Sequence, residues 1–75
     1  MITSNISLGM NVFIEKTSTI NNVRIEDDTK VGGYVKIFGS VDNILHIGKG
    51  CYVGINSIIE GFNAKVTIGN YVSFA

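Results

Sequence analysis

A short pattern returns four times along the chain. Each copy reads apolar, polar, apolar, then Gly or Glu, and the copies are Ile6–Gly9, Val23–Glu26, Leu45–Gly48 and Val66–Gly69. Their second apolar residues are Leu8, Ile25, Ile47 and Ile68, which gives spacings of 17, 22 and 21 residues. A repeat of roughly 20 residues is typical of solenoids, in which each unit stacks on the next. We therefore expect a stack of coils.

A finer repeat of six residues runs inside each unit. An aliphatic residue is followed by Gly, Ala, Glu or Asp, two free positions, a small residue and one more free position. Strand side chains alternate between two faces, so the aliphatic and small positions share the inner face. Three hexads close one three-sided coil. Full matches begin at Leu8, Ile14, Ile25, Val31, Ile47, Val53 and Ile68.

The third hexad of each coil is irregular. It begins at Ile20, Ile37 and Ile59, matches the pattern only in part, and contains all of the length variation. The pattern therefore predicts that every insertion lies at one corner. The predicted inward residues are Leu8, Ile14, Ile20, Ile25, Val31, Ile37, Ile47, Val53, Ile59 and Ile68.

Composition agrees with an all-β fold. Twelve Ile and eight Val stand against two Leu and two Ala, a balance that favours strands over helices. A compact domain of 75 residues buries only about 60% of its unfolded surface, and the single cysteine allows no internal disulfide. A compact core of this size is therefore only marginally stable, and contacts between stacked coils would supply additional stability. We predict one domain over 1–75, about three and a half coils with bounds near 6–22, 23–44, 45–65 and 66–75, the last incomplete.

Charge and hydropathy exclude several classes of function. The formal net charge is zero with both signs interspersed, so the chain lacks the basic field that nucleic acids and anionic membranes require. No apolar run approaches the roughly 18 to 20 residues of a membrane span. Residues 1–5 do not resemble a signal peptide, and a cytoplasmic location is expected.

The hexads resemble the hexapeptide-repeat acyltransferase family, from Ile6 to Ala75. The family's fold is a left-handed parallel β-helix, and this handedness is implied by the resemblance, since general crossover rules favour the right hand. The stretch VTIGNYVSFA at 66–75 is particularly similar to the bacterial sugar O-acetyltransferase branch. The resemblance implies acetyl-CoA as co-substrate, a sugar or amino-sugar acceptor, and a trimer.

The same resemblance implies that a histidine acts as general base, in or beyond the coil that follows a segment like 66–75. We therefore assign no catalytic residue and no acetyl-CoA-binding residue within the chain, and expect it to have no turnover alone. A non-catalytic β-solenoid module for assembly remains the alternative. Unpaired strand edges in the last coil predict self-association, as lateral trimers or end to end.

His46 is the only histidine, and the pattern places it in an outward column with Ser7, Arg24 and Thr67. Two interpretations are open: a solvated strand residue, or a contact to substrate or acyl-CoA near an intersubunit groove. A lone histidine excludes the three-histidine metal set found in one relative on this fold, the γ-class carbonic anhydrases. No metal site is expected.

Cys51 falls in the inward column of small residues, with Val12, Thr29 and Val72, and is interpreted as a core thiol. Gly48-Lys49-Gly50 lacks the spacing of a phosphate-binding loop and is predicted to be a turn between strands.

Two further groups stand near predicted corners. Glu26, Asp27 and Asp28 form an acidic cluster, interpreted as turn carboxylates rather than metal ligands. Phe38 and Phe62 could line a subunit contact or an acyl-CoA groove, or cover a corner of the core. Because aromatic residues concentrate at interfaces, the first two interpretations are favoured.

Overall fold

The structure is a computed structural model that describes residues 2–74, with side chains from residue 3 onward. All of its regular elements within 2–74 are β-strands. The strands are β1 (Ile2–Leu8), β2 (Phe13–Ile14), β3 (Thr19–Ile25), β4 (Lys30–Val31), β5 (Lys36–Phe38), β6 (Leu45–Ile47), β7 (Tyr52–Val53), β8 (Ile58–Glu60), β9 (Thr67–Ile68) and β10 (Ser73–Phe74).

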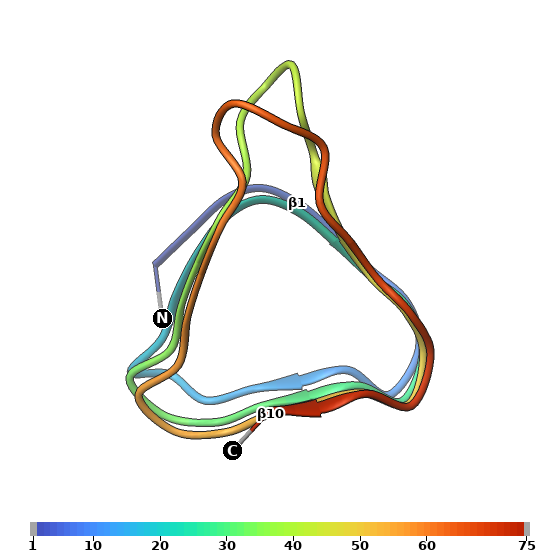
Figure 1. The fold of residues 1–75 in the computed structure, drawn as a ribbon. Coiled ribbons are helices and arrows are strands. Elements are labelled where there is room, and N and C mark those ends of the chain that lie inside the picture. Colours follow the sequence, from blue (N-terminus) through green and yellow to red (C-terminus); the bar gives the residue numbers. More distant parts are fainter. Residues whose placement is uncertain (1, 75) are drawn as a thin grey trace.

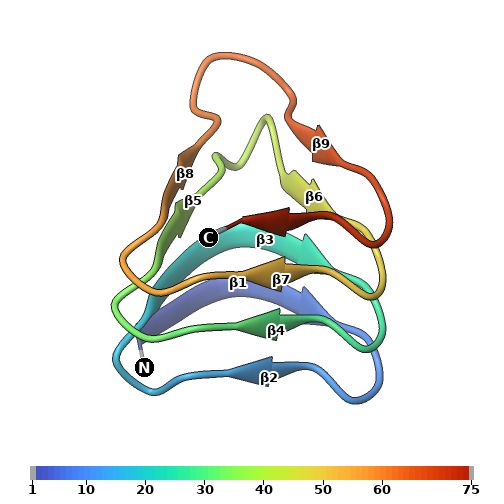
Figure 2. The ribbon, with the colours of Figure 1, turned by 60° about the horizontal axis from the view of Figure 1, so that its bottom comes forward.

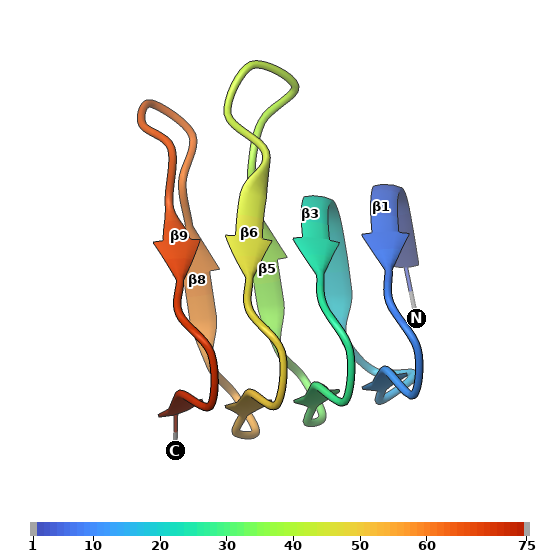
Figure 3. The same cartoon turned by 90° about the vertical axis from the view of Figure 1, so that its right-hand side faces the viewer.

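The strands form a triangular prism of stacked coils (Figure 1). Every strand pair is parallel, and the pairs join one coil to the next. Figure 3 shows β1, β3, β6 and β9 side by side in chain order. One face of the prism carries β2, β4, β7 and β10, hydrogen-bonded in that order. The predicted all-β solenoid is confirmed.

The coils wind with a left hand. In Figure 1 the chain runs clockwise from β1 towards β10, while successive coils come closer to the viewer. Figure 2 gives the same order from another side, with β2, β4, β7 and β10 rising in sequence. This is opposite to the usual right-handed crossover between parallel strands, and it agrees with the handedness that the family resemblance implies.

The two long strands, β1 and β3, turn a corner without breaking. Asn5 and Asn22 lie at the bend with φ of 52° and 56°, and Asn5 Nδ2 donates a 2.8 Å hydrogen bond to Asn22 Oδ1. Each long strand therefore contributes to two faces of the prism. The ladder also extends further toward the N-terminus than the hexads indicate, because Thr3 pairs with Ile20.

The predicted inward residues form three columns in register. Leu8, Ile25, Ile47 and Ile68 make one column, and the other two columns have three residues each: Ile14, Val31 and Val53, and Ile20, Ile37 and Ile59. Those in the middle coils are completely buried, whereas Leu8 in the first coil is 44% exposed. A fourth column, which the hexad pattern did not include, consists of Ile6, Val23, Leu45 and Val66.

The corners explain why Asn, Asp and Gly recur in this sequence. The corner that follows β1, β3, β6 and β9 has one residue of positive φ in every coil. Asn and Asp enter this left-handed region more readily than most residues, and glycine enters without steric cost. We call residues 9–12, 26–29, 48–51 and 69–72 the tight corner. Its positive-φ residues are Asn11, Asp28, Gly50 and Tyr71.

Hydrogen bonds between coils hold the tight corner. Asp27 Oδ1 accepts the Met10 N–H of the coil before it at 2.8 Å, and Asn70 Oδ1 accepts the Lys49 N–H in the same way at 3.0 Å. Main-chain bonds run alongside, such as Tyr71 N–H to Lys49 O at 2.9 Å. Each coil thus satisfies turn donors that its neighbour would otherwise leave to solvent.

Buried side chains also form hydrogen bonds between coils, on the inner side of the tight corner. The Thr29 hydroxyl donates to Gly48 O at 2.9 Å and accepts from Cys51 N–H at 3.2 Å. Cys51 occupies the next place in this column, and its Sγ lies 3.1 Å from Gly69 O. The thiol therefore repeats, one coil later, the contact that the threonine hydroxyl makes. Because both Thr29 hydrogen bonds are made, burying its hydroxyl carries no large penalty.

Candidate functional site

All length variation lies at one corner, as predicted. There the long strand of the earlier coils is replaced by a strand, a loop and a second strand, and the loops are residues 39–44 and 61–66 (Figure 2). We call the bend at Asn5 and Asn22 together with these two loops the variable corner. In Figure 1 the loops project beyond the triangle, one above the other.

The two loops are tied to each other. Ser40 Oγ donates to Phe62 O at 3.2 Å, and Asn43 Nδ2 donates to the same carbonyl at 3.4 Å. The rings of Phe38 and Phe62 stack, with centroids 6.2 Å apart and planes inclined by 16°. The loops thus form one double-layered projection, and their side nearer β5 and β8 is aromatic.

Gly39 allows the first loop to leave the prism. A Cβ at this position would lie 2.7 Å from Leu45 N and 3.0 Å from Asn43 O, closer than side-chain atoms approach main chain. The loop closes back on itself through paired hydrogen bonds of 3.1 Å between Ser40 and Asn43. A residue with a side chain at 39 would force this turn open.

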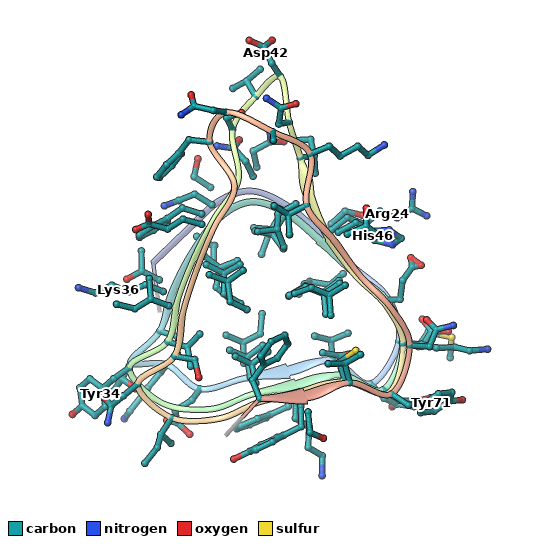
Figure 4. The ribbon with its side chains drawn as sticks, in the orientation of Figure 1. Arg24, Tyr34, Lys36, Asp42, His46 and Tyr71 are labelled. Carbon is teal, nitrogen blue, oxygen red and sulfur yellow. The ribbon has the colours of Figure 1, made fainter. Side chains whose placement is uncertain are left out.

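The opposite side of the projection adjoins the outward column that contains His46. Ser7, Arg24, His46 and Thr67 are direct neighbours in the parallel register, as predicted. In Figure 4 the Arg24 and His46 side chains point outward from the same face, next to the variable corner. All four side chains can donate hydrogen bonds, so the column is a row of donors across the coils.

A hollow of about 310 Å³ lies where this column meets the loops. Arg24 and His46 come from the prism face, whereas Ile44 and Lys65 come from the two loops. An arginine and a lysine therefore line one surface depression together with an apolar residue, Ile44. The hexads predicted neither loop residue, because the loops do not repeat.

A carboxylate neighbours this hollow. Arg24 Nε donates to Glu26 Oε1 at 3.2 Å, and the two side chains are 62% and 33% exposed. An exposed pair of this kind contributes roughly 0 to 1 kcal/mol to stability. Its main consequence is geometric, since it fixes the Nε edge of the guanidinium and leaves the Nη groups available.

The Nε2 atom of His46 is shielded from solvent, yet it accepts or donates no hydrogen bond within residues 3–74. Glu26 Oε1 is 3.9 Å away, which is beyond hydrogen-bond distance. The two groups are therefore neighbours without a hydrogen bond between them. The nitrogen is thus an unused hydrogen-bonding position on a residue that lines the hollow, since buried polar atoms are normally paired.

The remaining candidates have structural positions. Cys51 is buried as predicted, 2% exposed, and Gly48-Lys49-Gly50 forms the predicted turn between β6 and β7. The acidic residues lie at the tight corner, where Asp27 bonds to the main chain and Asp28 accepts from Asn11 Nδ2 at 3.3 Å. Sequence reasoning missed these roles, because hydrogen bonds between coils leave no periodic signal.

Among residues 2–74, no three His, Cys, Asp or Glu side chains lie close enough together to hold a metal ion. The same part of the chain contains no helix with the length and apolarity to cross a membrane.

Comparisons with known proteins add no family to this description. No protein-family model matches the chain, and searches of curated proteins and of solved structures gave no significant match. The acyltransferase family indicated by the hexads therefore stays a prediction, and the β-solenoid fold is what is established.

Proposed function

We propose that this chain is the β-helical portion of a homotrimeric, acyl-CoA-dependent transferase, which moves an acetyl group to a hydroxyl of a sugar or amino sugar. The observation that carries the proposal is the variable corner. Three-sided hexad coils keep their length everywhere else, and two tied loops project from one corner of a rigid prism. Loops held by a rigid scaffold are where binding residues concentrate.

The loops offer a surface suited to the apolar pantetheine arm of acetyl-CoA. Phe62 is 50% exposed beside the ring of Phe38, and Val41 near the loop tip is 78% exposed. Ligand sites are mostly apolar with few polar groups, and the aromatic side of the projection has this character. In a trimer, a neighbouring helix would cover it.

The proposal assigns no general base within residues 2–74. Such a base must reach the acceptor hydroxyl with a free nitrogen, and it is usually oriented by a partner on its second nitrogen. His46 lies on the other side of the projection from the Phe38–Phe62 stack. We therefore expect no acetyl transfer by this chain alone.

Titration of acetyl-CoA into ¹⁵N-labelled protein tests the proposal. We expect saturable shifts confined to residues 38–44 and 60–66, and weaker binding in a Phe62→Ser variant. Ile58→Ser is the matched control, because Ile58 is a similarly exposed apolar residue, at 63%, outside the loops. Binding that is absent, or equally weakened by both variants, would contradict the proposal.

Turnover is measured separately, with acetyl-CoA and a panel of sugar acceptors. Acetyl transfer that disappears in a His46→Ala variant would overturn the assignment of no catalytic residue. Without such transfer, binding of acetyl-CoA alone is the expected behaviour.

A non-catalytic assembly module is the second candidate, and the face of β2, β4, β7 and β10 favours it. Phe13, Lys30 and Tyr52 are neighbours in register on its outer side, and the two aromatic residues are 56% and 44% exposed. Equilibrium sedimentation distinguishes the candidates. Association that Phe13→Ser and Tyr52→Ser abolish, in a chain that binds no acetyl-CoA, would establish the assembly role.

A further inference from the structure

We propose that the hollow between Arg24, His46 and Lys65 binds a phosphate group. This goes beyond the proposed function and does not rest on it, because the hollow lies across the projection from the aromatic side and would hold phosphate whether or not acyl transfer takes place.

The side chains that line the hollow and carry N–H groups come from different parts of the fold. Arg24 comes from β3, His46 from its register neighbour β6, and Lys65 from the loop above them. Three donors thus approach one depression of about 310 Å³ from three parts of the fold. A tetrahedral anion can accept from several directions, whereas a planar carboxylate accepts mainly in its own plane.

Among the described residues, the guanidinium of Arg24 has one edge bonded within the chain and the other edge free. Paired recognition of a carboxylate commonly uses two parallel N–H groups of the guanidinium. Here Nε is already bonded to Glu26 Oε1 at 3.2 Å. The free Nη groups still carry charge and donors, and they suit an oxygen that approaches end on. The Glu26 pair therefore orients Arg24 and leaves its Nη groups free for a second anion.

The Nε2 atom of His46 lacks a hydrogen-bond partner among the described residues. Its Nε2 is shielded and makes no hydrogen bond within residues 3–74, and Glu26 Oε1 lies 3.9 Å away. In the tautomer that carries a hydrogen on Nε2, this nitrogen can donate a hydrogen bond. A turn of the imidazole ring would open Nε2 to the hollow, where a phosphate oxygen would give it the partner that it lacks.

Charge in the hollow also favours an anion. Arg24 and Lys65 bring two positive charges to this face, against one negative charge on Glu26. The formal net charge of the whole chain is zero, so this face is locally more basic than the molecule. Ile44 borders the same depression and gives it an apolar edge.

The test is a titration of inorganic phosphate into ¹⁵N-labelled protein, with chloride at constant ionic strength as the reference. We expect saturable shifts at residues 24, 44, 46 and 65–67 and in the His46 ring. Arg24→Gln and Lys65→Gln should each weaken binding about tenfold, because hydrogen bonds to charged groups are among the stronger ones. Together they should abolish it.

Lys36→Gln is the matched control. Lys36 is an exposed lysine on β5, and Figure 4 places it on a different face from Arg24 and His46. Its removal changes the net charge equally and should leave phosphate binding unchanged. A loss equal to that of Lys65→Gln, or shifts spread over all faces, would reduce the effect to general electrostatics and overturn the site.

Two further ligands identify the source of the phosphate. Glucose 1-phosphate represents a phosphorylated sugar, and adenosine 3′,5′-bisphosphate represents a nucleotide. Saturable binding of any of the three ligands at residues 24, 46 and 65 supports the site, and the tightest ligand names the class. If none of them binds there, the proposal is wrong, whatever the outcome of the acetyl-CoA experiments.

Discussion

The tight corner and the variable corner are built from the same chain in opposite ways. At the tight corner every coil has equal length, a residue of positive φ, and bonds to the coil before it, such as Met10 N–H to Asp27 Oδ1. At the variable corner the first two turns, at Asn5 and Asn22, are short, and the next two are loops of residues 39–44 and 61–66. The loops bond to each other through Phe62 O, and the first loop is tied to the prism at Gly39, whose N–H donates to Asn21 O.

The difference shows where a parallel solenoid can change. Strands on both sides of a corner keep their register through their own columns, for example Ile37 with Ile59 and Ile47 with Ile68. A corner can lengthen when its turn donors are satisfied locally. The first loop does this through the paired bonds between Ser40 and Asn43, whereas the turn bonds of the tight corner run from one coil to the next. Stability is thus concentrated at one corner, and the candidate binding surfaces at the other.

The largest effect should come from the buried side of the tight corner. Thr29→Val removes a hydroxyl that bonds Gly48 O and Cys51 N–H. Both groups stay buried without a partner, so we expect the free energy of unfolding to fall by about 2–4 kcal/mol, measured by urea denaturation. Thr29→Ser keeps the hydroxyl and should lose about 1 kcal/mol. Equal losses would contradict the hydrogen-bond role.

A smaller effect is expected at the turn itself. Gly50 has a φ of +67°, and a Cβ there would overlap the Tyr71 ring. Gly50→Ala should cost about 1–2 kcal/mol, from the left-handed backbone and from displacement of the ring. In a Tyr71→Ala background the ring contribution should vanish. A double-mutant cycle measures the difference, and no coupling between the positions would show that the ring does not matter.

The exposed side of the tight corner should contribute less. Asp27→Ala removes the acceptor of the Met10 N–H, and we expect a loss of about 1 kcal/mol in the free energy of unfolding. Asp27→Asn retains an acceptor oxygen, as Asn70 does in the last coil, and should be close to neutral. If Asp27→Asn costs as much as Asp27→Ala, charge rather than hydrogen bonding supports this corner.

The smallest effect on stability should come from the largest change. Replacing residues 38–44 and 60–65 each by Asn-Asn copies the turn at Asn21 and Asn22. Since the cost of closing a loop depends weakly on length, the free energy of unfolding should change by less than about 1 kcal/mol. Phosphate binding should disappear with Ile44 and Lys65. A loss of several kcal/mol would mean that the variable corner also holds the prism together.

Sequence reasoning reached the fold because the inner columns repeat residue by residue. The hexads placed Ile25, Val31 and Ile37 inward and located every insertion at one corner, and the register confirms both. They also placed His46 beside Arg24. They could not place Lys65, because its position depends on a loop path that no periodicity describes.

Two other features were beyond the same reasoning. The ring stacking of Phe38 and Phe62 depends on how two non-repeating loops fold over each other, and the sequence alone favoured a partner for these rings outside the chain. The hydrogen bonds of Asp27 and Asn70 depend on side-chain rotamers, and the alternation of inward and outward residues does not specify rotamers. Periodicity predicts whether a residue faces inward or outward. Contacts between side chains that do not repeat from coil to coil can be found only from the structure.

The buried thiol of Cys51 can report how often the last coil separates from the stack. Its Sγ lies under the fourth coil, 3.1 Å from Gly69 O, and the residue is only 2% exposed. An alkylating reagent can reach the sulfur only after that coil separates from the third. The rate of alkylation, compared with that of the unfolded chain, therefore reports the free energy of lifting one coil from the stack. A linear protein of this kind carries a built-in measure of cooperativity between adjacent repeats.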